Sequence, residues 1–287
     1  MDKTTVVGRR MRPGEKLLYC LIFLSALAVV LLSAGIILYV AARGVGQISW
    51  SFLTGVTSAL SGTVGIAGNL VNTLYLIVIT LLLATPIGVG SAVYLNEYAK
   101  GGRLVRLIVF TTEILAGIPS IIFGLFGMLF FGKWLGYSIL TGAFTMTLMT
   151  LPLITRSTQE ALKTVPDSYR QGALGLGAER WHMIRTVLLP TAMPGIVTGV
   201  ILAVGRMIGE SAALLFTAGS GYFLPRGLFS KLFESGGTLT VQLYLSMSKG
   251  EYKVAFGIAF VLLILVLGMN LLAKLIGRRL YRRASGE

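Results

Sequence analysis

Long blocks of apolar residues dominate this sequence, and shorter polar segments separate them. Six blocks are about as long as a helix must be to cross the hydrocarbon core of a bilayer. The pattern predicts membrane spans at 17–40, 70–95, 107–131, 137–155, 193–216 and 252–276. The first follows positive charges but is longer than the apolar region of a signal peptide, so we expect a retained helix. The predicted fold class is all-α, a polytopic membrane protein with six transmembrane helices.

Composition supports this class and narrows the chemistry. Of the 287 residues, 55% are hydrophobic and 13% charged, whereas soluble domains carry about 25% charge. The net charge of +14 lies between the apolar blocks, without a basic face interleaved with aromatics, so we expect no nucleic-acid partner. Cys20 is the single cysteine and His182 the single histidine, which excludes an intrachain disulfide and a thiolate metal site. We expect no metal and no cofactor.

Loop charges predict the orientation. With the N-terminus inside, 18 of the 25 lysines and arginines lie in cytoplasmic segments and 6 in outer segments. Such an excess is typical of cytoplasmic loops. We therefore expect both terminal segments, 1–16 and 277–287, to be cytoplasmic tails, and the segments 41–68 and 217–251 to lie outside.

Proline and glycine interrupt several of the predicted spans. Pro86 lies in the second, Gly117-Ile118-Pro119 in the third and Pro152 in the fourth. Membrane helices tolerate such breaks where neighbouring groups satisfy the freed backbone. Several broken helices favour a protein that surrounds a pathway, although kinks also occur in purely structural spans.

The longest cytoplasmic segment, 156–192, predicts a compact pair of short helices. Pro166 suits the first turn of a helix, which Gly175 and Gly177 then end. A second short helix is expected to begin near 178–179 and to stop before Pro190. The tip at 173–178 is small and apolar, and an exposed apolar tip implies a partner groove.

This loop resembles the coupling motif of bacterial ABC importer permeases. The motif reads Glu-Ala-Ala, three residues, Gly, nine residues, then Ile-x-Leu-Pro. Both spacings are kept here, with Gln-Gly-Ala in place of Glu-Ala-Ala and Val in place of Ile. In that family the loop docks on a cytoplasmic ATPase subunit. The resemblance therefore implies ATPase coupling for Gln171, Gly172, Ala173, Leu174, Gly177, Val187, Leu189 and Pro190.

The resemblance covers 70–276, which we expect to form the ABC transmembrane permease domain, with 17–40 as an added first helix. Within the family, the stretches 115–125 and 206–215 resemble phosphate permeases, most of all the PstA type. That resemblance implies a multi-pass protein of the bacterial inner membrane. It also implies three kinds of partner, besides the lipid bilayer: an ABC ATPase in two copies, a homologous PstC-like permease and an extracytoplasmic phosphate-binding protein.

Three ionisable residues fall within predicted spans, where each costs about 2.5–3.5 kcal/mol at a helix centre. They are Glu113, Arg206 and Glu210. Because Arg206 and Glu210 are four residues apart, we expect them to share a helix face. They form either a structural salt bridge or a substrate site, in which the Arg206 fork binds a phosphate oxygen and Glu210 orients it.

Other candidate pathway residues keep two interpretations each. Glu113 either faces the pathway or pairs with Arg103 or Arg106 near the cytoplasmic interface. Asn72 and Thr73 either donate to the passing anion or form a helix cap or an interhelical hydrogen bond.

The motifs of two enzyme classes are missing from the sequence. Neither a Gly-x-x-x-x-Gly-Lys-Ser/Thr phosphate loop nor a His-Glu-x-x-His motif is present, so we expect a non-catalytic subunit with ATP hydrolysis in a partner. The predicted function is phosphate import by alternating access. The alternatives are a sulfate or molybdate permease, or a secondary anion transporter, although the two similar halves common in the latter are not found.

Overall fold

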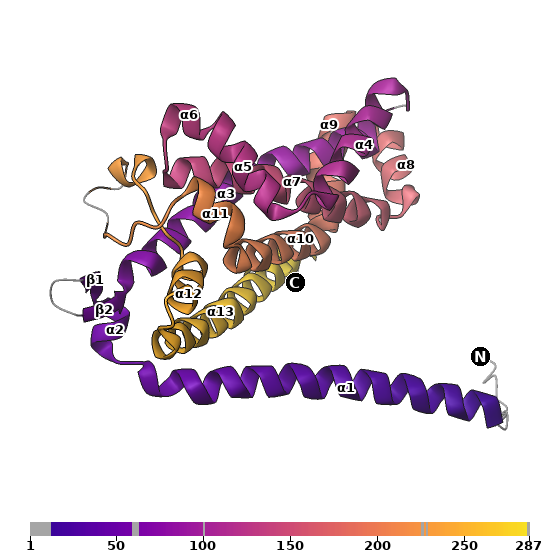
Figure 1. Ribbon diagram of the computed structural model, residues 1–287. Helices are drawn as coiled ribbons and strands as arrows, with labels where there is room; N and C mark the ends of the chain where they lie inside the picture. The colour runs from indigo at the N-terminus through magenta and orange to yellow at the C-terminus, as the bar shows by residue number, and fades with distance from the viewer. Residues whose placement is uncertain (1–12, 59–62, 100, 225–226, 228, 286–287) are drawn as a thin grey trace.

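The computed structural model describes residues 13–285 except 59–62, 100, 225–226 and 228, and these are mostly helical (Figure 1). Five helical segments are long and apolar enough to cross a membrane, and a bent pair is a possible sixth. This confirms the predicted polytopic all-α class. The long helices are α1 (Pro13–Gly44), α3 (Ala67–Val93), α7 (Ile139–Lys163), α10 (Leu189–Gly209) and α13 (Tyr252–Ser285).

The predicted third span, 107–131, is broken at the predicted interruption, Gly117-Ile118-Pro119. Two helices, α4 (Arg103–Gly117) and α5 (Ser120–Phe130), are bent by 110° relative to each other. Pro119 disfavours the helical conformation of the residue before it, and Ile118 is accordingly extended, with ψ 130°. The break leaves α4 free to take a direction different from that of α5.

The predicted fifth span, 193–216, needs correction at both ends. Helix α9 (Arg180–Met183) continues through the π-helical turn η3 (Ile184–Leu188) into α10. The predicted second short helix therefore does not stop before Pro190. Pro190 is the second residue of α10, directly after the π-helical turn, and a proline or a π-helical turn within a helix interrupts its regular hydrogen bonds. At the other end α10 stops at Gly209, and α11 (Ala212–Thr217) is a separate short helix.

The core forms where α3 and α10 pack on α7 and where α13 packs on α10. Small residues allow the backbones of α7 and α10 to approach closely. A Cβ added at Gly195 would lie 2.4 Å from Cβ of Ala161, and one at Gly199 would lie 2.5 Å from Cβ of Ser157. Such contacts are typical of helix packing in membranes, where no hydrophobic drive pulls helices together.

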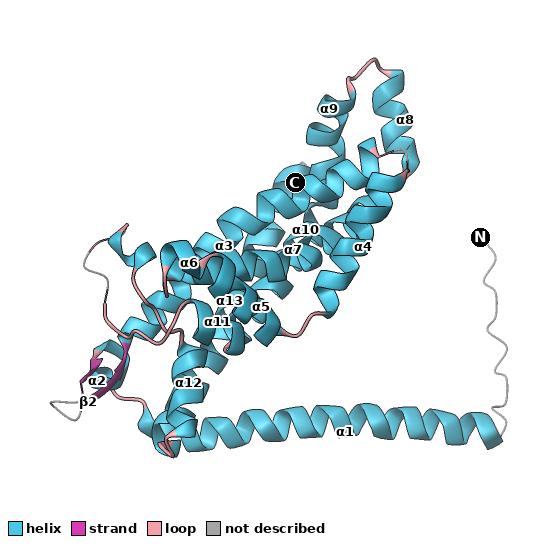
Figure 2. Cartoon of the chain, turned by 45° about the horizontal axis from the view of Figure 1, so that its top comes forward, coloured by secondary structure: helices cyan, strands magenta, loops and turns pink. Residues whose placement is uncertain are grey.

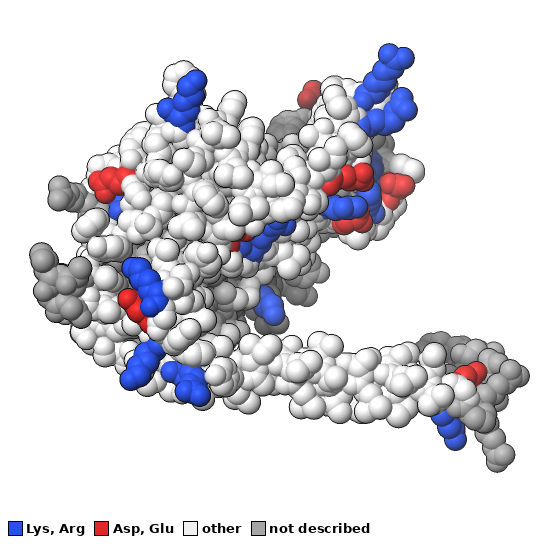
Figure 3. All heavy atoms as spheres, viewed as in Figure 1, with Lys and Arg blue, Asp and Glu red and all other residues white. Residues whose placement is uncertain are grey.

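Helix α1 stands apart from this core. It contacts α13 and otherwise extends away from the body in both ribbon views (Figures 1 and 2). The window that qualifies it as a membrane span is 0% buried within the chain. Figure 3 shows charged atoms only near its two ends, as a lipid-facing or partner-facing helix requires.

The two ends of the body carry different structures (Figure 2). The hairpin end holds an antiparallel pair in which Val56 is opposite Ile66, and the opposite end holds two short helices, α8 and α9. The remaining elements are η1 (Val45–Gln47), α2 (Trp50–Thr54), β1 (Val56–Ser58), β2 (Thr63–Ile66), η2 (Tyr94–Tyr98), α6 (Gly132–Leu135), α8 (Asp167–Gly175), η4 (Ser230–Phe233) and α12 (Leu239–Ser248).

Both predicted tails lie partly within described helices, and their cytoplasmic location stays a prediction. Of the segment 1–16, residues 1–12 lie outside the described residues, and α1 already begins at Pro13. Of the segment 277–287, residues up to Ser285 continue α13, and 286–287 lie outside the described residues.

Candidate functional site

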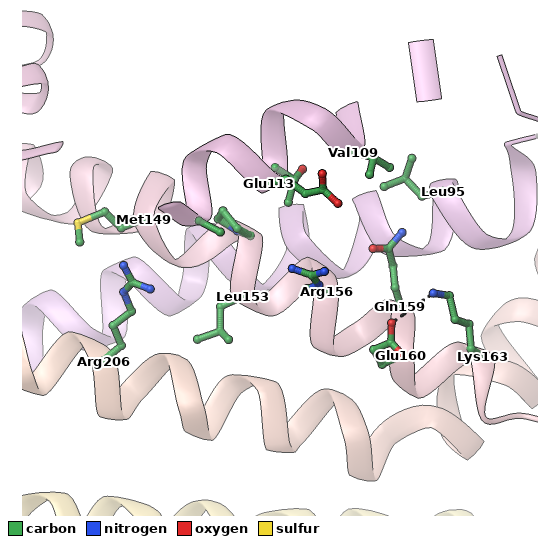
Figure 4. Close-up of a pocket in the computed structure, with 13 residues that line it drawn as sticks. Leu95, Val109, Glu113, Met149, Leu153, Arg156, Gln159, Glu160, Lys163 and Arg206 are labelled. Atoms are coloured by element: carbon green, nitrogen blue, oxygen red, sulfur yellow. Dashed lines mark hydrogen bonds and ion pairs between the residues drawn. The ribbon is translucent and has the colours of Figure 1, made fainter. Parts of the chain in front are cut away.

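A cavity of about 380 Å³ opens between η2, α4, α7 and α10 (Figure 4). Its wall is mixed, with apolar side chains alternating with charged and amide groups. The lining residues are Leu95, Val109, Thr112, Glu113, Ala116, Met149, Pro152, Leu153, Arg156, Gln159, Glu160, Lys163 and Arg206.

Two arginines from different helices face this space, and we call it the two-arginine cavity. Arg206 rises from α10, and Arg156 projects from α7 (Figure 4). Among the residues that the structure describes, neither guanidinium has a hydrogen-bond or ion-pair partner. Guanidinium groups bind oxyanions through parallel hydrogen bonds, so both side chains carry a chemistry that suits an oxyanion.

Sequence reasoning missed Arg156. The predicted fourth span ended at 155, which made this arginine a cytoplasmic loop charge. In the structure α7 continues to Lys163, because Ala161 and Leu162 extend its buried face. The signal was present in the spacing, since Arg156, Gln159, Glu160 and Lys163 recur at the three- and four-residue intervals of one helix face.

Carboxylates balance part of the positive charge in the cavity. Glu160 pairs with Lys163 at 3.2 Å. Glu113 reaches the cavity from α4, on the side opposite α10 (Figure 4). Within the described part of the chain Glu113 makes no ion pair with Arg103 or Arg106, and its role in the pathway stays a prediction.

The expected shared face of Arg206 and Glu210 is wrong. Helix α10 ends at Gly209, and Glu210 is extended, with ψ 124°, so its side chain leaves the face that carries Arg206. Glu210 Oε1 instead accepts a hydrogen bond from the backbone N–H of Ala213 at 3.1 Å, at the start of α11. The Thr240 hydroxyl shares its single hydrogen between the carbonyl oxygens of Ile208 and Glu210, at 3.1 and 3.0 Å, beside the helix break.

The structure does not bring Asn72 and Thr73 to the cavity. Asn72 Nδ2 donates to the carbonyl oxygens of Gly221 and Gly237 at 3.0 and 3.2 Å. Thr73 Oγ1 donates to the Asn69 carbonyl at 2.7 Å and accepts from the Leu239 N–H at 3.0 Å. Both are buried and tie α3 to the segment 221–239, as the hydrogen-bonding alternative expected.

The first predicted short helix of the segment 156–192 is present as α8, whereas the second begins as α9 and continues into α10; we call residues 167–183 the knob. Gly177 has φ +82°, which favours glycine, and lies in open space. It lets the chain reverse at the tip, where Leu176 is 91% exposed. The opposite face of the knob is buried: Met183 and Ile184 pack with Leu162 of α7.

The residues of the coupling motif divide between the tip and the base of this knob. Gln171, Gly172, Leu174 and Gly177 are exposed, and Ala173 is half-buried. Val187, Leu189 and Pro190 are half-buried in η3 and the first turn of α10. The first group is free to touch a partner, whereas the second connects the knob to α10.

Known proteins with similar sequences are transport permeases. The family model described as "Binding-protein-dependent transport system inner membrane component" matches residues 84–286. A probable ABC transporter permease protein, YqgI of Bacillus subtilis, is 37% identical over 95% of this chain and 98% of its own. The phosphate transport system permease protein PstA 1 of Mycobacterium tuberculosis is 34% identical over 80% of this chain and 73% of its own.

Solved structures agree on the fold. The MetNI methionine ABC transporter in an inward-facing conformation matches with a TM-score of 0.62 at 22% identity, covering 75% of this chain and 95% of that chain. A bacterial alginate ABC transporter in complex with a periplasmic protein matches with a TM-score of 0.68 at 15% identity, covering 93% and 96%.

The family match spans most of the chain, and the relatives extend along nearly all of it. The membrane-crossing helices, the knob and the broken spans fit a multi-pass protein of the inner membrane. This chain belongs to the binding-protein-dependent transport system inner membrane component family, and it is a permease subunit of an ABC importer.

Proposed function

We propose that this permease translocates inorganic phosphate across the inner membrane. The observation that carries the proposal is the two-arginine cavity, in which Arg156 and Arg206 face one space from two helices without partners among the described residues. Both arginines are exposed in the described chain and lie within helices of membrane-spanning length, where charged side chains are costly and mark substrate pathways. Two that remain available suit a passing oxyanion, and resemblance to the PstA proteins favours phosphate.

The proposed mechanism is alternating access. Two permease chains enclose the pathway, this one and a PstC-like homologue, and an extracytoplasmic phosphate-binding protein delivers the anion. Two ABC ATPase subunits dock on the knobs, and their closure on ATP turns the pathway outward. Hydrolysis returns it inward. The exposed apolar tip at Leu176 supports docking at this surface.

The arrangement of the ends supports a cytoplasmic knob and cytoplasmic termini. The N-terminus of α1 lies toward the knob end in Figures 1 and 2, and α13 runs from α12 toward that same end. The excess of lysine and arginine in the same segments agrees with this orientation.

The test is uptake of labelled phosphate, sulfate and molybdate by the complex that copurifies with this chain, reconstituted in proteoliposomes with ATP. We expect ATP-dependent uptake of phosphate. Preferential uptake of sulfate or molybdate would show that one of these anions, and not phosphate, is the substrate. Uptake without ATP or an ATPase subunit would favour a secondary transporter.

A further inference from the structure

A partly buried ion pair joins the knob to the end of α3. Arg170, on α8, contacts Glu97, in the π-helical turn η2. Arg170 Nη2 lies 2.9 Å from Glu97 Oε1, and Arg170 Nε lies 3.3 and 3.4 Å from the two carboxylate oxygens. Two nitrogens of one guanidinium thus hold one carboxylate, a geometry that fixes direction as well as distance.

The remaining donors of Arg170 grip the end of α7. Its Nη2 also donates to the Leu162 carbonyl at 3.0 Å, and its Nη1 donates to the Val165 carbonyl at 2.9 Å. A final contact, at 3.0 Å, reaches Asp167 on the knob itself. A guanidinium has five N–H donors, so these contacts use its full capacity and connect three segments at one side chain.

Exposure separates the two carboxylates that Arg170 touches. The side chain of Glu97 is 6% exposed, whereas that of Asp167 is 83% exposed. Hydrogen bonding to Glu97 raises the pKa of Arg170 above its ordinary value, so the guanidinium stays charged. An exposed pair is weak, but a buried pair that loses one partner leaves an uncompensated charge. The inner contact therefore holds the knob in place.

The segments that Arg170 grips also wall the two-arginine cavity. Leu95, two residues before Glu97, lines the cavity from η2, and Lys163, next to Leu162, lines it from α7. A second contact joins the same surfaces, because the Arg180 guanidinium lies 5.8 Å from the centre of the Tyr98 ring. Displacement of the knob would consequently move two walls of the cavity.

We propose that Arg170 and Glu97 are a positioning pair that transmits knob movement to the two-arginine cavity. The inference rests on the proposed docking of an ATPase on the knob. Neither residue contacts the anion, because neither lines the cavity. Their removal should therefore uncouple cavity and knob while the exposed tip still binds the ATPase.

The experiment uses the complex purified through a tag on this chain, with Cys20→Ser and Val109→Cys as the reference. Cys20 is the only native cysteine of the chain, and Val109 lines the cavity. Labelling of position 109 by N-ethylmaleimide is measured with and without ATP and vanadate, alongside ATPase copurification and phosphate uptake. We expect Glu97→Gln to keep the ATPase, to lose the nucleotide-dependent change in labelling, and to reduce uptake roughly tenfold or more.

Two further variants sharpen the result. Arg170→Lys keeps the charge but loses the fork, so its labelling change should be reduced in the same direction. Asp167→Asn removes only the exposed carboxylate and should match the reference within about twofold in uptake.

The proposal is overturned if Glu97→Gln keeps the full nucleotide-dependent change in labelling. It is also overturned if Glu97→Gln no longer copurifies with the ATPase, since the pair would then shape the docking surface. If Glu97→Gln and Arg170→Lys both fail to reach the membrane, the pair is needed for folding and the proposal is likewise overturned. A reference complex whose labelling ignores ATP would instead refute ATPase docking on the knob. The labelling result does not depend on which oxyanion is transported.

Discussion

The hairpin end and the two-arginine cavity both place polar side chains within an apolar protein. They differ in whether those side chains have hydrogen-bond partners in the protein. At the hairpin end, Asn72, Thr73 and Lys231 are buried and donate to backbone carbonyls. In the cavity, Arg156 and Arg206 have no such partners among the described residues. Satisfied groups hold segments together, whereas groups left available can bind something that arrives.

At the hairpin end, buried polar side chains donate hydrogen bonds to backbone carbonyls. Lys231 is 0% exposed, and its Nζ donates to the Phe223 carbonyl at 2.9 Å while Glu234 lies 3.5 Å away. Asn69 and Asn72 both donate to the Gly237 carbonyl. These bonds fix the described parts of the segment 221–237, which are irregular apart from η4. The comparison therefore indicates a structural role for the first polar set and supports the transport role proposed for the second.

The largest effect is expected for Arg206→Gln. If the guanidinium binds the anion, its loss removes a charged hydrogen bond worth about 1.5–3 kcal/mol, which is roughly a 10- to 150-fold decrease in phosphate uptake. Membrane abundance should be normal, because Arg206 has no protein partner in the described chain. Arg206→Lys should retain part of the uptake. Uptake and abundance are measured together, and a poorly expressed Arg206→Gln chain would mean that this arginine is structural.

Lys231→Met should lower the stability of the protein. Phosphate uptake per folded molecule should be unchanged. The change removes a part-buried hydrogen bond from a charged donor to the Phe223 carbonyl, at a cost of about 1.5–3 kcal/mol. We expect a lower midpoint of thermal unfolding in detergent. Lys249→Met, at an exposed position, is the control and should not shift the midpoint. Equal midpoints for both variants would remove the structural role of Lys231.

A smaller loss of stability is expected for Thr73→Val. Its hydroxyl accepts from the Leu239 N–H and donates to the carbonyl four residues earlier. Thr198 makes only a contact of the second kind, to Pro194 at 2.8 Å. Thermal unfolding of Thr73→Val and Thr198→Val thus isolates the bond to Leu239, for which we expect about 0.5–1.5 kcal/mol. No difference between them would show that this bond does not hold the hairpin end.

The sequence predicts what depends on local composition. Apolar blocks of membrane-spanning length identified the helices, and the glycines at 175 and 177 identified the knob, because both signals act over a few residues. The direction of α4 was not predictable, since Pro119 marks a break without fixing the angle that packing selects.

The site was recovered only in part. Arg206 and Glu113 were found, because charge within an apolar block is conspicuous, but Arg156 was assigned to a loop. The pair Glu97–Arg170 spans 73 positions, and the Asn72–Gly221 contact spans 149. Such contacts depend on how helices are brought together, and no periodicity in one sequence records that.

The smallest effect is expected for Glu210→Gln, and it decides whether Arg206 belongs with the available groups. Glu210 Oε1 accepts from the Ala213 N–H at the start of α11, and the amide oxygen of glutamine can accept the same bond. The change should therefore leave uptake nearly unchanged and alter the free energy of unfolding by only roughly a few tenths of a kcal/mol. Glu210→Ala should cost about 0.5–2 kcal/mol of stability, because the helix cap is lost. A salt bridge to Arg206 makes a different prediction. Breaking a buried pair costs about 3–5 kcal/mol, and Arg206→Gln in the same chain should then rescue Glu210→Gln. Thermal unfolding and uptake of the single and double variants separate these cases. If Glu210→Gln has no effect and the double variant is inactive, Arg206 is not paired with Glu210 and is available to bind the anion.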